Sequence, residues 1–312
     1  MAVPPGARRP PVTDRPLAGV DDAHRLRRFL MDTYALAGRP FNWEARRWEG
    51  MFWTVSPDRL ADPAYGAGAH VWHTTDGSLV AAAIPDGPGD LALQVDPDHR
   101  WVEDDVLSWA ERHLPRCQDG ERVLDTWAFD WDAERRERLE GRGYVPVSGS
   151  FWQLRRRAAS QPVGTRPLPR GYTLRAAGRS WVEAQRWVQA TNAVFGQATT
   201  AEEYATFMRS PSFDPELHVV VEAPDGSVAA FAGLTVDDAN RTAVLEPVGA
   251  LPQHRRLGLA QAAILEGMRR LAQRPVDWIY VANWGTADAA RLYESVDLAP
   301  CAIQAAWRRV LS

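Results

Sequence analysis

The chain has 312 residues, of which 45% are hydrophobic and 24% charged, and its formal net charge is −4. This length predicts two domains, and the composition is that of a globular protein. No apolar run reaches the roughly 18 residues of a membrane span, and the negative charge disfavours nonspecific binding to nucleic acid.

The N-terminal segment, residues 1–17, is rich in proline and arginine and has no apolar stretch of a secretory signal. We expect a disordered tail there and a cytoplasmic location. The two cysteines, Cys117 and Cys301, have no CxxC pattern or Cys/His cluster beside them. They predict free thiols in a reducing compartment and no structural metal.

Residues 18–154 alternate between helical and extended patterns. Asp76-Gly77 between two apolar runs predicts a β-hairpin over 69–85. The remaining elements predicted in this half are helices over 21–37, 102–114 and 132–141 and strands over 91–95, 123–129 and 145–154. This order of elements predicts a mixed α/β domain.

An aromatic segment follows the first predicted helix and contains Trp43, Trp48, Phe52 and Trp53. One interpretation is an acceptor pocket in which Glu44 and Glu49 attract a cationic amine. The other interpretation, which the composition favours, is a core between the domains.

Residues 155–170 are polar and proline-rich and predict an interdomain linker. Residues 171–312 then repeat the order of the first half. The elements predicted there are helices over 180–194, 200–209, 258–273 and 286–295, a hairpin over 218–234, and strands over 242–250, 277–282 and 301–310. Two matched motifs, at Pro97 and Pro252 and at Arg138 and Arg291, recur at nearly the same offset and predict a duplication.

The strongest motif lies in residues 248–261, where a β-rich run ends, a turn follows and an amphipathic helix begins. Gly258 allows the backbone to approach a bulky anion, and the helix N-terminus adds roughly half a positive charge. Arg255 and Arg256 add charge-assisted contacts. The turn therefore predicts backbone N–H groups that bind a phosphate.

With Arg255, Gly258 and Ala260, this segment resembles the (Arg/Gln)-x-x-Gly-x-(Gly/Ala) motif of the GNAT family of acyl-CoA-dependent N-acyltransferases. The resemblance implies tandem GNAT folds, each a mixed, mostly antiparallel sheet flanked by helices, with a splayed cleft for acetyl-CoA. It assigns the diphosphate to Arg255, Arg256, Leu257, Gly258, Leu259, Ala260 and Gln261. It assigns the pantetheine arm to backbone groups of Val248, Gly249 and Ala250.

A second motif, at 289–295, resembles the family's Asn-x-x-Ala-x-x-Leu-Tyr-Glu helix, in which the tyrosine hydroxyl protonates the departing thiolate. This resemblance makes Tyr293 the general acid, and the alternative is a buried core aromatic. Thr286 stands where the family has Asn, and Asn283 is a possible substitute, so both are candidate cofactor-binding residues. Asp297 replaces a Gly at the helix exit and predicts a different local turn.

Glu246 precedes the loop on the strand that faces the cleft in the family, and it is a candidate base for the amine, directly or through water. Residues 244, 246 and 248 share one face if the strand is regular. The alternative is a surface or salt-bridged Glu. A backbone N–H near Val248 is the candidate oxyanion donor.

The first half departs from these motifs. Glu103 stands at the position of Gly258, Asp105 at that of Ala260, and Glu140 at that of Tyr293. Carboxylates there would repel a diphosphate, so residues 18–154 predict a degenerate GNAT-like domain that is structural or walls the acceptor site.

The resulting hypothesis is an enzyme that transfers acetyl from acetyl-CoA to the primary amine of a small molecule, by direct attack in a ternary complex. It requires no metal, nucleic acid or membrane, and we expect a monomer or homodimer. The alternatives are a CoA-binding sensor without turnover and a protein N-acetyltransferase.

Overall fold

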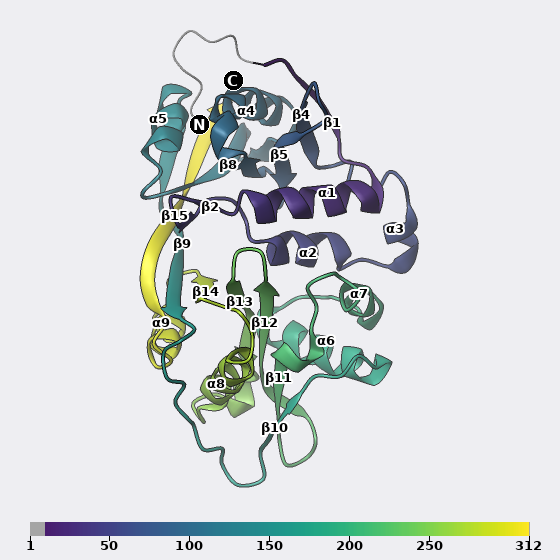
Figure 1. Ribbon diagram of the computed structural model, residues 1–312, viewed down its shortest axis with the longest axis vertical. Coiled ribbons are helices and arrows are strands. Elements are labelled where there is room, and N and C mark those ends of the chain that lie inside the picture. Colours follow the sequence, from purple (N-terminus) through teal and green to yellow (C-terminus); the bar gives the residue numbers. More distant parts are fainter. Residues whose placement is uncertain (1–9, 312) are drawn as a thin grey trace. The chain divides into compact units, whose positions relative to one another are not determined.

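The computed structural model describes residues 10–311 (Figure 1). They form two compact units: unit 1 holds residues up to Ala45, Leu60–Trp152 and those from Ala302 onward, and unit 2 holds Arg46–Arg59 and Gln153–Cys301. These units differ from the predicted ranges 18–154 and 171–312. The difference has two causes. The helical segment Arg46–Arg59 lies in the first half of the chain but belongs to unit 2, and the last strand of each half extends into the unit formed mainly by the other half.

Unit 1 is a twisted sheet with helices on both faces. Its strands lie in the order β1-β4-β5-β6-β8-β15, antiparallel except for the β6–β8 pair. Buried residues of α4 and α5 pack on the sheet in one apolar core. The elements are β1 (Val12–Pro16), α1 (Gly19–Asp32), β2 (Ala35–Leu36), β3 (Arg39–Pro40), β4 (His70–Thr74), β5 (Leu79–Pro85), β6 (Asp90–Val95), α4 (Glu103–His113), β7 (Arg116–Gln118), β8 (Glu121–Phe129) and α5 (Ala133–Gly141).

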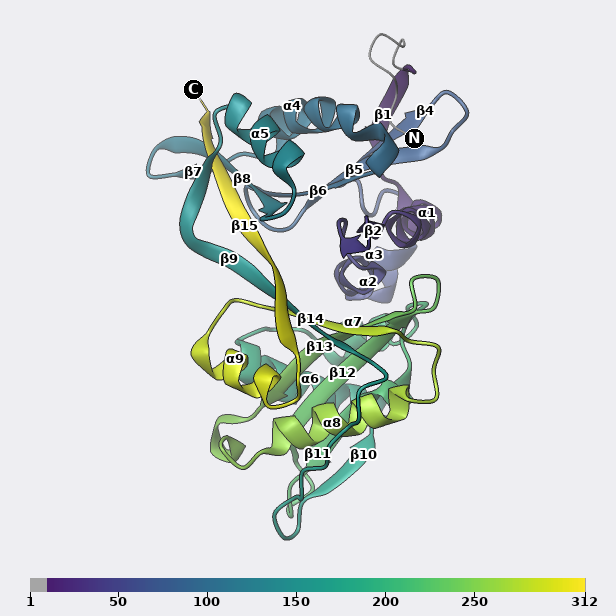
Figure 2. The same ribbon diagram turned by 60° about the vertical axis from the view of Figure 1, so that its left-hand side comes forward.

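Unit 2 repeats this plan in the strand order β9-β14-β13-β12-β11-β10, antiparallel except for the β13–β14 pair. Helix α8 packs on β11, β12 and β13 (Figure 2). The elements are α2 (Ala45–Trp53), α3 (Pro57–Ala61), β10 (Thr173–Ala176), α6 (Trp181–Phe195), α7 (Ala201–Phe207), β11 (His218–Glu222), β12 (Val228–Asp237), β13 (Thr242–Ala250), α8 (Leu259–Leu271), β14 (Trp278–Asn283) and α9 (Ala287–Glu294).

The last strand of each half completes the sheet of the other unit. Strand β9 (Val145–Ala158) ends the first half, and its residues from Gln153 onward pair with β14 in unit 2. Strand β15 (Ala299–Leu311) ends the chain and pairs with β8 in unit 1. Each unit therefore depends on residues from both halves of the sequence for its backbone hydrogen bonds.

Strands β13 and β14 pair over only three residues each, Thr242–Val244 with Trp278–Tyr280. Beyond this point β13 continues to Ala250 beside β12, while β14 continues beside β9. One edge of β13 from residue 245 onward therefore has no strand partner. This is the splayed pair that the family resemblance implies.

The predicted mixed α/β fold with a mostly antiparallel sheet is confirmed. The disordered tail over 1–17 is wrong for Val12–Pro16, which form β1 beside β4, and residues 1–9 lie outside the described part. The linker over 155–170 is wrong for residues 155–158, which are part of β9. Of the aromatic segment, Trp48, Phe52 and Trp53 lie in the helix α2.

Candidate functional site

The turn before α8 holds a row of backbone donors without partners. Arg256 and Gly258 both have left-handed backbone angles, φ +65° and +77°, and α8 begins directly afterwards at Leu259. No side chain caps the helix, and no described residue accepts a hydrogen bond from the N–H groups of residues 256–261. Successive free N–H groups at a helix N-terminus form a concave anion site.

The strand that leads into this turn presents alternate backbone groups to its unpaired edge. The N–H of Leu251 donates to Ala229 of β12 at 2.9 Å. Because strand backbone groups alternate in direction, Ala250 and Val248 direct theirs away from β12. The carbonyl of Ala250 accepts a bond from Nε of Arg255 at 3.3 Å, which leaves the Val248 groups for an extended ligand.

Gly249 has a packing reason for its lack of a side chain. A Cβ at this position would lie 2.7 Å from Cζ of Phe231 and 2.8 Å from Cγ1 of Val194. Both contacts are closer than real Cβ atoms approach, so a larger residue would displace the strand from α6. Gly249 therefore allows β13 to lie close to Phe231 of β12 and to Val194 of α6.

The strand that carries Glu246 is not regular. Gly233 of β12 lies opposite two residues of β13, Glu246 and Pro247. This bulge shifts the alternation by one residue, so Leu245 and Val248 both pack against the core under α8.

The condition on which residues 244, 246 and 248 would share one face, a regular strand, is therefore not met. Glu246 itself is exposed at the bulge, where bulges re-aim a side chain.

Tyr293 is buried, with 7% of its surface exposed, and it belongs to the core under α8 and α9. Burial and, to a smaller extent, the Glu246 charge raise the pKa of its hydroxyl to about 12, against the opposing effect of Arg155. No described residue forms a hydrogen bond with the hydroxyl. The structure therefore brings Tyr293 within electrostatic range of Glu246 and keeps the phenol protonated as a donor.

The remaining candidates have local roles in the structure. Thr286 is the N-cap of α9, with its hydroxyl accepting from the N–H of Ala289. Asn283 is buried, and in the orientation that satisfies its amide it accepts from Gly285 N–H at 2.9 Å. Nε2 of Gln261 donates to the Ser295 carbonyl at 3.1 Å. Of these bonds, the one from Gln261 joins α8 to the end of α9, and the other two are local.

The predicted change at the exit of α9 does not occur. Asp297 adopts the left-handed conformation, φ +61°, that the family's Gly would take. The N–H of Leu298 then bonds to the carbonyl of Tyr293 at 3.0 Å. An aspartate tolerates this conformation at modest cost, so the turn keeps its form.

Arg155 on β9 is a residue that the sequence gave no reason to select. It is 2% exposed, donates to the Leu298 carbonyl at 3.1 Å, and lies 3.3 Å from Oε1 of Glu294. It thereby anchors the end of α9 and sets the charge near Tyr293. The sequence could not indicate this role, because Arg155 falls in the predicted linker. The pairing of β9 with β14 places it beside α9.

The corresponding turn in unit 1 is filled by its own carboxylate. Glu103 is fully buried, and its oxygens lie 3.0 Å from Nε of Arg100, 3.2 Å from Nη2 of Arg135 and 3.6 Å from Nε of Arg138. The N–H of Glu103 bonds to the carbonyl of Arg100. This arrangement leaves no free donor at that residue for an external anion.

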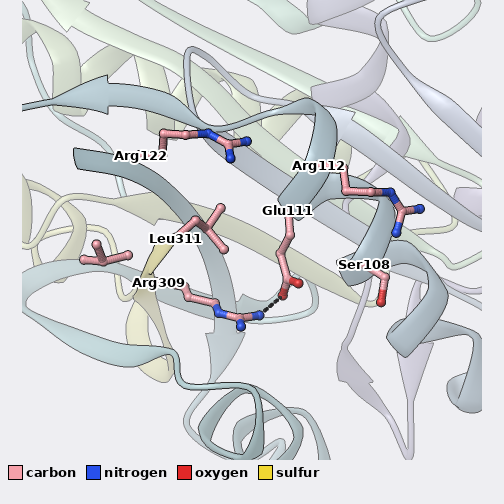
Figure 3. Close-up of a pocket in the computed structure, with 7 residues that line it drawn as sticks. Ser108, Glu111, Arg112, Arg122, Arg309 and Leu311 are labelled. Atoms are coloured by element: carbon pink, nitrogen blue, oxygen red, sulfur yellow. Dashed lines mark ion pairs between the residues drawn. The ribbon is translucent and has the colours of Figure 1, made fainter. Parts of the chain in front are cut away.

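Unit 1 also contains an open pocket of about 550 Å³, away from this turn, between α4 and the ends of β8 and β15 (Figure 3). Its lining is polar, and Glu111 pairs with Arg309 at 2.7 Å. Burial opposes the shift, but Arg142 and Arg309 hold the pKa of Glu111 below its usual value. The hydroxyl of Ser108 in its lining donates to the carbonyl of Asp104 at 2.7 Å and accepts from Nη2 of Arg142 at 3.0 Å.

The aromatic residues of the 41–53 segment are buried. Trp43 is 7% exposed, Trp48 and Phe52 are 2% exposed, and Trp53 is 4% exposed. Glu49 is fully buried and accepts from the hydroxyl of Ser212 at 2.7 Å. This burial agrees with a core role for the segment. Glu49, one of the two carboxylates proposed to attract a cationic amine, is instead bonded to Ser212.

The candidate site of unit 2 thus combines a splayed strand pair, a helix N-terminus whose first N–H groups have no partner among the described residues, and a buried tyrosine. Residues 181–297 match the Acetyltransferase (GNAT) family. The matched residues lie in unit 2, and the fold of residues 10–311 is similar to that of a solved tandem GNAT protein.

Known proteins resemble the chain at two levels. A mycothiol acetyltransferase of Nocardiopsis dassonvillei is 36% identical over 97 residues, which span 28% of this chain and 29% of that relative. A GCN5-related N-acetyltransferase from Sphaerobacter thermophilus has the same fold, with a TM-score of 0.64, 19% identity, and coverage of 96% of this chain and 95% of its own. A tandem GNAT protein from the clavulanic acid biosynthesis pathway also has a TM-score of 0.64, with 15% identity and coverage of 96% and 98%.

Two general features complete the description. Within residues 10–311, no helix is long and apolar enough to cross a membrane. Both cysteines are exposed, neither forms a disulfide within the described residues, and Sγ of Cys301 donates to the carbonyl of Leu154 at 3.4 Å.

Proposed function

We propose that unit 2 is an acetyl-CoA-dependent N-acetyltransferase that acts on the primary amine of a small molecule. The observation that supports this most is the run of unpartnered N–H groups at residues 256–261, next to the unpaired edge of β13. A diphosphate at the turn and a pantetheine arm along Val248 would satisfy both sets of groups. The acyl carbon would then lie near the bulge at Glu246.

The proposed reaction is direct transfer in a ternary complex. Glu246 accepts a proton from the ammonium, directly or through water, and the free amine attacks the thioester carbonyl. The N–H of Val248 stabilises the oxyanion. As the intermediate collapses, the C–S bond breaks and the thiolate takes the proton of the Tyr293 hydroxyl. The nitrogen gives up its surplus proton, which through water restores the tyrosine hydroxyl, and the neutral amide is left.

The raised pKa of Tyr293 fits the acid role. A phenol with a pKa of about 12 is fully protonated near neutral pH, so it can donate throughout the physiological range. Glu246 is exposed and can exchange its proton with solvent after each turnover. The proposed mechanism thus assigns proton donation to Tyr293 and proton acceptance to Glu246.

Tyr293→Phe tests this mechanism. Thiol release from acetyl-CoA with a panel of amines should fall about 100-fold in kcat, the size expected for loss of a general acid, while CoA affinity stays unchanged. Tyr280→Phe, another buried tyrosine, is the matched control and should retain activity. CoA binding without turnover for any amine, and no effect of Tyr293→Phe, would favour a sensor instead.

A further inference from the structure

Arg166, in the segment between the two halves, lies against the anion turn of unit 2. A Cβ placed on Gly258 would lie 2.5 Å from Nε of Arg166, 2.9 Å from its Nη2 and 3.0 Å from its Cζ. The guanidinium therefore fills the space that a side chain at position 258 would take. It lies beside the N–H groups of residues 256–261 that have no described partner.

The segment that carries Arg166 is anchored to unit 2. Nη2 of Arg157 donates to the carbonyls of Gln161 and Pro162, each at 3.1 Å. Three apolar residues on both sides of Arg166 pack against the core under α8: Ala159, Val163 and Leu168. This packing fixes the path of the segment, so it differs from the flexible linker that its composition predicts.

Arg166 has no counterion among the described residues. It is exposed and takes part in no ion pair or hydrogen bond there. Arg255 and Arg256 lie in the same turn, and among residues 10–311 the one ion pair that they form joins Nη1 of Arg256 to Oδ1 of Asp288 at 3.8 Å. Arginines gathered at one helix N-terminus repel each other unless an anion joins them.

We propose that Arg166 is a binding residue for the diphosphate of the CoA thioester, a role that rests on the proposed function. A planar guanidinium matches two phosphate oxygens at once, and its position against Gly258 aims it at the group that the turn amides would hold. The diphosphate would then be held between the turn of one half and the segment that follows the other.

Calorimetry on the full chain tests this role with CoA and with dephospho-CoA, which keeps the diphosphate and lacks the 3′-phosphate. Arg166→Ala should lower the affinity for both ligands by roughly ten- to a hundredfold, as expected for loss of a charged hydrogen bond. Arg166→Lys should recover part of the loss. Arg170→Ala, an exposed arginine of the same segment, is the control and should leave affinity unchanged.

The outcomes separate the inference from the function on which it rests. A wild-type chain that binds neither ligand would overturn the proposed function. Wild-type binding with no loss in Arg166→Ala would overturn only the role of Arg166. A loss for CoA but none for dephospho-CoA would place the guanidinium on the 3′-phosphate and overturn the diphosphate assignment.

Discussion

The turn before α4 in unit 1 and the turn before α8 in unit 2 have the same place in the fold but opposite contents. In unit 1 Glu103 supplies an internal anion that three arginines surround. In unit 2 Gly258 leaves that space to the guanidinium of Arg166 and to unpaired N–H groups. The residue at this one position therefore makes the difference. With Glu103 the positive charge of the turn is neutralised by a side chain of the protein, and with Gly258 it is left for an external anion.

The largest effect is expected when Gly258 of unit 2 is replaced by the glutamate that unit 1 has at the same place. Gly258→Glu would place a carboxylate against Arg166 and in the path of the diphosphate, so CoA affinity should fall more than about 1,000-fold. Calorimetry measures this loss, and the chain should stay folded.

The control for this substitution is Gly196→Glu, another glycine with positive φ, +67°, and with open space around it. Both variants carry a backbone strain of about 1–2 kcal/mol, but only Gly258→Glu should lose CoA. Equal affinity in the two variants would refute the assignment of the turn.

The reverse change concerns stability. Glu103→Ala leaves Arg100, Arg135 and Arg138 without their shared carboxylate, and loss of one partner of a buried ion pair costs about 3–5 kcal/mol. Urea unfolding should show this loss while CoA affinity is unchanged. Asp104→Ala, whose partly exposed side chain also pairs with Arg138, should cost less than about 1 kcal/mol. Equal costs would show that the internal anion does not hold unit 1 together.

A smaller effect involves histidines at the first residues of β4 and β11. Nε2 of His70 in unit 1 lies 2.7 Å from Asp14, whereas Nε2 of His218 in unit 2 is buried without a partner. Burial lowers the pKa of His218 to about 4. The unfolded chain, with an ordinary pKa near 6.5, therefore binds more protons between pH 4 and 6.5, and stability falls as the pH falls through that window.

Between pH 6.5 and 5 this single group should cost the wild type about 2 kcal/mol of unfolding free energy. His218→Gln removes the titrating group, so its stability should change less over the same interval in urea titrations. An identical pH slope in both proteins would show that His218 is not the neutral, buried group described here.

Much of the fold follows from local sequence. Gly77 and Gly226 have positive φ at the predicted hairpin turns, and Thr286 caps the predicted helix. The exchange of β9 and β15 between the units did not follow, because strand order depends on pairings far apart in the chain. Strand β1 was missed because Pro16 and the polar residues before it lack an apolar alternation.

Candidate site residues were predictable where the residue type itself carries the chemistry, as at Gly258 and Tyr293, and their roles stay predictions. The bulge at Glu246 was not, because register depends on the facing strand and on Gly233. Arg166 was not predictable as a site residue, because the composition of the segment around it indicates a linker. Contacts of three apolar residues with the core help to fix the path of that segment.

A crystal structure of the full chain with CoA tests the central claim most directly. The account predicts the diphosphate against the N–H groups of residues 256–261, with Arg166 in contact and nothing bound at residues 97–105. A diphosphate located at the unit 1 turn, or CoA bound with the unit 2 turn empty, would contradict it.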